Sequence, residues 1–238
     1  MLVARAFGLC YDLNLTTRGE MEYAFLGETT TPSRCGRMDQ ACAYGPNTMV
    51  TMTYDGDLLH VEQIDVAADV HLVLVDLRAA KSTVAILGGL QRGYPHPESE
   101  VERGVHELLG PLNERMVAQT EAALAEGNMP RLGELMREAQ AAFDRLAGPA
   151  CPEELEAPVL HRALTHEAIR PHVWGAKGVG SQGDGTAQFL CKSEADAEAV
   201  CRIVEAELDM VPLRLTIKAN TAHAGEVPES PHAKKASI

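Results

Sequence analysis

The sequence predicts an α+β protein in which helices and a β-hairpin come first and a ferredoxin-like domain follows. Three observations lead to this class. Asp55-Gly56 lies between two segments rich in β-forming residues, which is typical of a hairpin turn. Apolar residues recur at helical spacing through much of the chain. From residue 69 the expected order is strand, helices, strand, strand, helix, strand, the split βαβ order of a ferredoxin-like domain.

Residues 1–68 are expected to hold two helices and then the hairpin. Met1 to Cys10 places its apolar residues on one helical face. Leu15 to Glu28 contains Thr17-x-x-Glu20, which we interpret as a capping box. The paired strands are expected over Met49–Tyr54 and Leu58–Ile64.

Residues 69–220 begin with Val70 to Leu77, an apolar run suited to a strand buried on both faces. Apolar residues at helical spacing then predict helices over Glu100–Glu126, Met129–Leu146, Glu153–Ala168 with a kink at Pro158, and Ser193–Asp209. The remaining expected strands are Val173–Lys177, Thr186–Cys191 and Leu213–Lys218. Residues 221–238 have little apolar content and are predicted to be a flexible tail.

The composition excludes several classes of protein. Lys and Arg total 21 against 34 Asp and Glu, so a net charge of -13 argues against nucleic-acid or anionic-membrane binding. No apolar run reaches about 18 residues, and no cleavable signal is found. The six cysteines contain no Cys-x-x-Cys pair, so we expect reduced core residues in a cytoplasmic protein and no metal site of the zinc type.

The stretch from Thr31 to Gly45 carries the first chemical signal. Ser33 can cap a helix there and Gly45 can end it, which places Asp39 in the middle. Its neighbours at helical spacing are apolar, so Asp39 is predicted to face inward. Two interpretations remain open: a buried carboxylate paired with Arg34, Arg37 or a backbone amide, or a general base that accepts a hydroxyl proton.

A glycine-rich loop and a short basic run carry the second signal. Gly178-x-Gly180-x-x-Gly183 matches the dinucleotide fingerprint, but the strand-like Thr186–Cys191 follows where that motif requires a helix. The loop is therefore either a plain hairpin connection or a place where backbone amides approach a ligand. Lys81-Ser-Thr83 reads by spacing alone as a helix start with an exposed lysine.

Two of these stretches resemble motifs of the GHMP small-molecule kinases. Cys35-Gly-Arg-Met-Asp-Gln40, followed by Tyr44-Gly45, is similar to the family's helix in which a Gly-x-x-Asp-Gln run carries the catalytic aspartate. The run from Gly175 to Thr186 resembles the family's motif Gly-x-Lys-x-x-Gly-x-Gly-Gly-Gly-Gly, although Gln182 and Asp184 interrupt the glycines. Asp184 would repel a triphosphate unless a metal intervened, so the resemblance leaves phosphate contact by this loop open.

The resemblance implies transfer of the γ-phosphoryl group from Mg²⁺-bound ATP to a hydroxyl of a sugar or sugar acid, with Asp39 as the catalytic residue. Arg34 and Arg37 are candidates to hold a carboxylate or phosphate of the substrate. Lys81 and Thr83 are candidate substrate contacts, as in the mevalonate-kinase branch. The active-site loop residues implied are Gly178, Gly180, Ser181, Gly183 and Gly185.

The family's phosphate-binding loop, Pro-x-x-x-Gly-Leu-Ser-Ser-Ser-Ala, does not occur in the sequence. The resemblance spans nearly all of this chain but about the last two-thirds of a family member. We therefore expect an incomplete N-terminal kinase domain over 1–68 and a C-terminal domain over 69–220, in a fragment or mis-started product. The function classes are a sugar kinase, a kinase of the mevalonate type, or a non-catalytic sugar-binding or regulatory protein.

Overall fold

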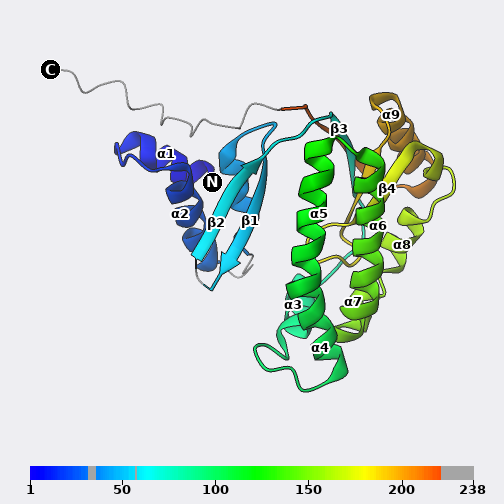
Figure 1. Cartoon of the computed structure of the whole chain (residues 1–238), viewed down its shortest axis with the longest axis horizontal. Coiled ribbons are helices and arrows are strands. Elements are labelled where there is room, and N and C mark those ends of the chain that lie inside the picture. Colours follow the sequence, from blue (N-terminus) through cyan, green and yellow to red (C-terminus); the bar gives the residue numbers. More distant parts are fainter. Residues whose placement is uncertain (32–35, 57, 221–238) are drawn as a thin grey trace. The chain divides into compact units, whose positions relative to one another are not determined.

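The computed structural model describes residues 1–31, 36–56 and 58–220. The described residues form two compact units, unit 1 from Met1 to Asp65 and unit 2 from Val66 to Asn220 (Figure 1). Both units combine helices with antiparallel strands, so the expected α+β class is confirmed. The expected tail over 221–238 lies outside the described residues.

The described residues of unit 1 form three helices and a two-stranded sheet. Its elements in chain order are α1 (Leu2–Cys10), α2 (Thr17–Thr29), a short 3₁₀ helix (Asp39–Tyr44), β1 (Met49–Asp55) and β2 (Leu58–Ile64). The cap of α2 is Thr16, whose hydroxyl accepts a hydrogen bond from the Gly19 amide at 3.1 Å. The predicted cap at Thr17 is therefore wrong by one residue.

The predicted hairpin is confirmed. β1 and β2 pair antiparallel with Asp55 opposite Leu58, so two residues make the turn. Gly56 has φ +57°, a conformation that favours glycine and that two-residue hairpin turns require.

The core of unit 1 is small. Met21, Ala43 and Leu59 are its buried members and come from α2, the 3₁₀ helix and β2. Arg5 on α1 adds polar contacts, because its guanidinium donates to Glu20 at 2.9 and 2.6 Å and to the Ala43 carbonyl at 3.0 Å. Arg5 thus connects three of the unit's elements.

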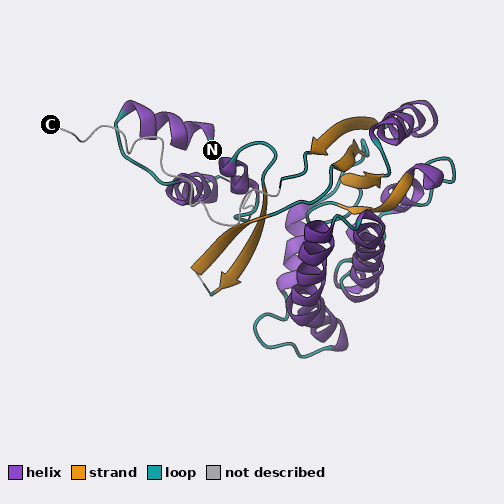
Figure 2. Ribbon diagram, turned by 45° about the horizontal axis from the view of Figure 1, so that its top comes forward, coloured by secondary structure: helices purple, strands orange, loops and turns teal. Residues whose placement is uncertain are grey.

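Unit 2 is organised around a four-stranded sheet, drawn in orange in Figure 2. Its strands are β3 (Val70–Asp76), β4 (Val173–Gly178), β5 (Thr186–Cys191) and β6 (Val211–Ile217). The order in the sheet is β4-β5-β3-β6 with every neighbouring pair antiparallel, as a split βαβ arrangement requires. In the central strand, Val73 lies opposite Phe189 on one side and Arg214 on the other.

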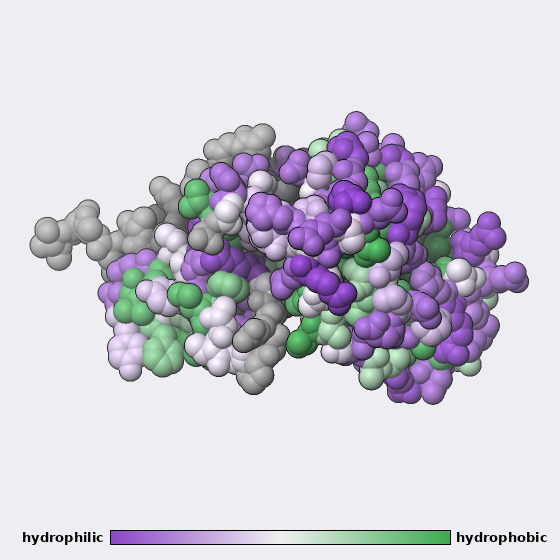
Figure 3. Space-filling view, turned by 90° about the horizontal axis from the view of Figure 1, so that it is seen from below, coloured by the Kyte–Doolittle hydropathy of each residue, from purple (hydrophilic) through white to green (hydrophobic). Residues whose placement is uncertain are grey.

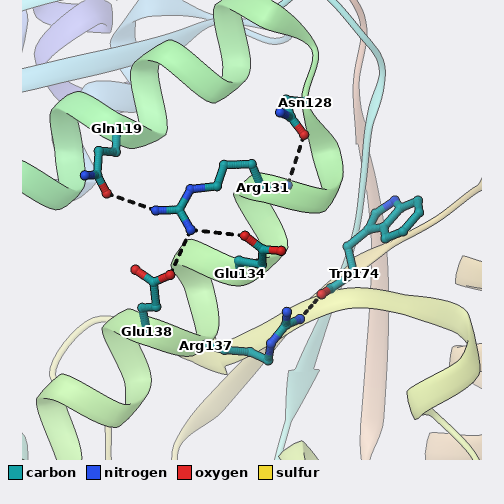
Figure 4. Close-up of polar contacts among 7 residues, drawn as sticks. All are labelled: Gln119, Asn128, Arg131, Glu134, Arg137, Glu138 and Trp174. Atoms are coloured by element: carbon teal, nitrogen blue, oxygen red, sulfur yellow. Dashed lines mark hydrogen bonds and ion pairs between the residues drawn. The ribbon is translucent and has the colours of Figure 1, made fainter.

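The helices of unit 2 connect these strands. They are α3 (Thr83–Gln91), α4 (Glu100–Glu107), α5 (Asn113–Glu126), α6 (Met129–Leu146), α7 (Pro152–Leu155), α8 (Pro158–Leu164) and α9 (Glu194–Ile203). α5 and α6 run side by side (Figure 1). Arg131 on α6 contacts Gln119 on α5 at 3.2 Å and its own helix's Glu134 and Glu138 at 3.1 and 2.8 Å (Figure 4).

Three predicted helices are shorter or more broken than expected. The segment 100–126 is interrupted by a π-helical turn, Leu108–Leu112, where Gly110 leaves helical geometry and Pro111 supplies no amide proton. The segment 153–168 divides into α7 and α8 at Ala157, which has φ +41°. The segment 193–209 is capped by Ser193 as expected but ends in a π-helical turn, Val204–Leu208.

The sheet of unit 2 is covered on both faces. Val73 and Phe189 are fully buried against α8 and α9. On the opposite face α6 approaches β4 so closely that a Cβ atom added to Gly175 would lie 2.1 Å from the Gly133 carbonyl oxygen. Successive residues of a strand point to opposite faces, so Gly175 faces α6 and Ala176 faces the other side. Ala176 packs against the core that contains Val73 and Phe189, and β4 is therefore held between α6 and α8.

The cysteine prediction is correct in part. Cys151 and Cys191 are buried, whereas Cys10 and Cys42 are exposed. Within the described residues, no helix has the length and apolar character needed to cross a membrane.

Candidate functional site

Lys81 and the glycine loop, about a hundred residues apart in the chain, meet in unit 2. Lys81 follows β3 and directly precedes Ser82, the cap of α3. Its ammonium donates to Ser181 Oγ at 3.1 Å and to the Gln182 carbonyl at 2.8 Å. Lys81 is half-buried, so the interpretation as an exposed lysine at a helix start is wrong. Burial lowers the pKa of the Lys81 ammonium.

Glycines make this contact possible. A Cβ atom added to Gly185 would lie 2.7 Å from Lys81 Cε, so a side chain there would displace the lysine. Gly183 is buried with φ +68°, and its neighbours include Ile86 of α3 and the Glu154 carbonyl of α7. The loop therefore packs against the start of α3 rather than forming a plain solvent-exposed hairpin connection.

Among the described residues, Asp184 is bound by α8 and not by Lys81. One carboxylate oxygen accepts a hydrogen bond from the Leu160 amide at 2.8 Å, in the first turn of α8. A carboxylate is stabilised at that end of a helix by the free amides and the helix dipole. Asp184 thus has a structural role at the start of α8, and phosphate contact by the loop stays a prediction.

The start of α3 has its own support. The Ser82 hydroxyl accepts from the Ala85 amide at 3.2 Å, and the Ser82 amide donates to Glu154 at 2.8 Å. Thr83 is the first residue of α3 and is exposed, so its hydroxyl is accessible in unit 2. Glu154 was missed by sequence reasoning, because a contact over 72 residues leaves no spacing signal.

The first glycine of the loop is bound from several sides. The Gly178 amide donates to Gln140 Oε1 at 2.7 Å, and its carbonyl accepts from Lys177 at 2.8 Å and Gln182 Nε2 at 3.2 Å. Burial lowers the pKa of the Lys177 ammonium. Lys177 and Gln182 both lie in the glycine-rich motif, whereas nothing in the sequence pointed to Gln140. Gly180 is exposed at the tip with φ +61°.

Asp39 lies in unit 1, and its predicted setting is wrong. It is the first residue of the 3₁₀ helix Asp39–Tyr44 and is exposed, not a mid-helix residue on a buried face. Gly45 ends this helix with φ +93°. Within the described residues Asp39 makes no hydrogen bond or ion pair, so its carboxylate is not neutralised by Arg37. The helix is shorter than expected, which removes the periodicity on which the inward orientation rested.

Arg37 is held by α2. Its guanidinium lies 3.6 Å from Glu22 and 4.6 Å from the centre of the Phe25 ring. The expected partners of Arg37, Asp39 or an anionic group of the substrate, would therefore compete with Glu22 and the Phe25 ring for its guanidinium. Arg34 and the expected cap Ser33 lie outside the described residues.

Within the described residues, no group of three or more His, Cys, Asp or Glu side chains is placed to hold a metal ion. Mg²⁺ is commonly bound through one or two carboxylates together with substrate phosphates rather than by a cage of protein ligands.

Comparisons with known proteins show which solved structures share the fold of this chain. No protein-family model matches the chain, and no curated protein matches it significantly. Among solved structures, the mevalonate kinase of L. major in complex with R-mevalonate is similar with 22% identity and a TM-score of 0.69. Lactococcus lactis galactokinase complexed with galactose follows with 16% identity and a TM-score of 0.66.

These two matches cover 92% of this chain, and the chain spans 63% of the length of each. The Lin0012 protein of Listeria innocua is similar with a TM-score of 0.73 at 14% identity, over 90% of this chain and 63% of that one.

Proposed function

Because the chain has the fold of the GHMP kinases, we propose that it belongs to an ATP-dependent small-molecule kinase that phosphorylates a hydroxyl of a sugar or sugar acid. One observation carries the proposal beyond the fold. Lys81 binds the glycine loop through Ser181 and Gln182, which joins two stretches that the sequence singled out independently. A plain structural hairpin has no need of a half-buried lysine without a carboxylate partner.

In the proposed reaction, Asp39 accepts the proton of the acceptor hydroxyl while the hydroxyl oxygen attacks the γ-phosphorus of ATP. The bond between the γ-phosphorus and the oxygen that leaves with ADP breaks. Its exposed, unpaired carboxylate is available for this role within the described residues. Arg34 and Arg37 are proposed to hold an anionic group of the acceptor. ATP supplies the phosphoryl group, with Mg²⁺ shielding its charge.

In unit 2, Lys81 and Thr83 are proposed to contact the substrate, and the glycine loop is proposed to contact the nucleotide or the transferred group. Lys81 has a third ammonium proton beyond its two hydrogen bonds, which a substrate oxygen can accept. The exposed Thr83 hydroxyl stands two residues further on. Phosphoryl transfer also needs a loop that binds the triphosphate. These 238 residues contain no such run, so we propose that the same polypeptide or another one supplies it.

The acceptor class rests on the Cys35–Gln40 run. The similar structures include a galactokinase with galactose and a mevalonate kinase with R-mevalonate, at comparable TM-scores. A mevalonate-type acceptor is therefore the second candidate, and a non-catalytic sugar-binding protein is the third.

The test is phosphoryl transfer from labelled ATP with Mg²⁺ to a panel of sugars, sugar acids and mevalonate. The protein is purified from its source under native conditions, so that any further polypeptide it needs is present. We expect one acceptor to be labelled. Thermal shift of the 238-residue chain separates the classes: stabilisation by a sugar without stabilisation by Mg·ATP, together with no transfer, supports the binding protein and contradicts the kinase.

A further inference from the structure

A groove in unit 2 lies apart from Lys81 and Thr83. It has a volume of about 680 Å³ and is bounded by α6, α8 and β4. Its polar and aromatic lining comprises Arg137, Gln140, Asp144, His161, Arg170 and Trp174. Sites for small ligands in proteins typically have volumes of roughly 300–1,000 Å³.

The floor of the groove is the outer edge of β4. The Trp174 carbonyl accepts a hydrogen bond from Arg137 (Figure 4), and the Gly178 amide donates to Gln140 at 2.7 Å. In an antiparallel pair, alternate residues direct their backbone groups away from the neighbouring strand. Ala176 therefore directs its amide and carbonyl to the same side as the Gly178 amide. It lies between the Trp174 carbonyl and the Gly178 amide, which are both hydrogen-bonded to side chains of α6.

The lining carries two arginines, Arg137 and Arg170, and one carboxylate, Asp144. The Asp144 carboxylate accepts a hydrogen bond from Gln140 at 2.8 Å and lies 3.6 Å from His161. Arg170 is exposed, and its guanidinium has no partner among the described residues. In a chain with a net charge of -13, this grouping of cations favours an anionic ligand.

Apolar side chains also line the groove. Leu164, Ile169 and Val173 contribute to the groove together with Trp174. A ligand with an anionic group and an apolar or planar body would use both parts of the lining. Its anionic group would bind the arginines, and its body would pack against the apolar side chains.

We propose that this groove binds a small organic anion. Arg170 and Arg137 bind its carboxylate or phosphate group, and the Ala176 amide donates to a neighbouring oxygen. Gln140 lines the groove and accepts a hydrogen bond from the Gly178 amide, so the bound anion would lie beside the side chain that holds the first glycine of the loop.

The chain supplies its own reporter. Trp174 is the only tryptophan in the sequence and lines the groove, so its fluorescence follows occupancy. The probes are citrate, inorganic pyrophosphate and glucose 6-phosphate, titrated into the 238-residue chain at constant ionic strength. We expect a saturable change with at least one organic probe, and weaker binding at high salt.

Matched variants locate the site. Arg170→Gln removes a cation that supports no internal contact, and we expect at least tenfold weaker binding. Arg145→Gln on α6 and Arg162→Gln on α8 remove exposed cations outside the groove and should leave affinity unchanged. Arg170→Lys should recover part of the binding, because it restores charge but not the planar fork.

The proposal is overturned if none of the three probes gives a saturable change. Equal weakening by Arg145→Gln and Arg170→Gln would likewise overturn it, since the response would then reflect overall charge. Binding of pyrophosphate alone, with no organic probe bound, would contradict the assignment to an organic anion. None of these outcomes depends on kinase activity.

Discussion

Units 1 and 2 differ in how they treat large apolar side chains. In unit 2, Val73 and Phe189 are completely buried between the sheet and its helices. In unit 1, α1 has no buried residue, and Phe7 and Leu9 are 55% and 64% exposed. Figure 3 shows the same contrast, with hydrophobic residues gathered over the α1 and α2 region and a mostly hydrophilic surface over unit 2.

Helical periodicity alone therefore does not locate a core. The apolar residues of α1 recur at helical spacing, yet none of its residues is buried. Arg5 connects α1 to Glu20 and to the Ala43 carbonyl, and Phe7 stacks on its neighbour Tyr11. The groove between α1 and α2 is lined largely by apolar side chains. Contiguous exposed apolar surface of this kind typically marks a face that another chain segment or molecule covers.

The largest expected effect is loss of the unit 2 core. Phe189→Ala should destabilise unit 2 by about 3–5 kcal/mol, because it removes a fully buried ring from the central packing layer. Urea unfolding followed by Trp174 fluorescence measures this, since the only tryptophan lies in unit 2. Phe7→Ala in unit 1 is the control and should leave the Trp174 transition in place. Equal shifts from both variants would contradict the contrast between the units.

A smaller effect is expected where two backbones meet. Gly175→Ala should destabilise unit 2 by about 1–3 kcal/mol, because its Cβ would collide with Gly133 on α6. Gly27→Ala in α2 has no neighbour within 4 Å and should stabilise its helix by about 0.5–1 kcal/mol. Circular dichroism of thermal unfolding, read beside Trp174 fluorescence, checks both. A Gly175→Ala protein as stable as the parent would show that α6 is not in contact with β4.

Polar contacts should matter more in unit 1. Arg5→Gln removes the charged hydrogen bonds to Glu20 and Ala43, so the amides of α1 should exchange with solvent faster. Hydrogen exchange read by mass spectrometry measures this, while the Trp174 transition stays unchanged. Arg18→Gln, which changes an exposed arginine on α2, is the control. Unchanged exchange in α1 after Arg5→Gln would remove the polar account of unit 1.

The smallest effect is a pH dependence in unit 2. Hydrogen bonds from Ser193 and then His172 hold the pKa of Asp196 below its ordinary value. A carboxyl whose folded pKa is lowered contributes stability above its unfolded pKa of about 3.9, and this is lost as the pH falls. Asp196→Asn should therefore flatten the loss of unit 2 stability between about pH 5 and pH 3. If the stability of the Asp196→Asn protein fell with pH as steeply as that of the parent, the proposed contribution of Asp196 would be contradicted.

The sequence predicted the parts of the fold that rest on local pattern. The hairpin around Gly56, the apolar run of β3 and the Ser193 cap of α9 all follow from short spacing, and the structure confirms them. Glycine followed by proline at 110–111 is typical of a helix break. The break was nevertheless not predicted, because apolar residues recur at helical spacing on both sides of it.

The site was less accessible to sequence reasoning. Lys81 and Ser181 were each found through the chain's motifs, but their contact spans 100 residues and has no spacing signature. The exposure of Asp39 was missed, because the helix is a short 3₁₀ turn and the assumed periodicity does not apply. The groove at β4 had no sequence signal, since α6, α8 and β4 contribute its residues from separate stretches.

The most direct test of the central proposal compares phosphoryl transfer by the natively purified protein and by its Asp39→Asn variant. We expect labelled phosphate to reach a sugar, sugar acid or mevalonate, and the variant to be slower by about 10²–10⁴-fold. Asp12→Asn, an exposed aspartate elsewhere in unit 1, should retain full activity. Transfer at the normal rate by Asp39→Asn, or no transfer to any acceptor by the unaltered protein, would contradict the account.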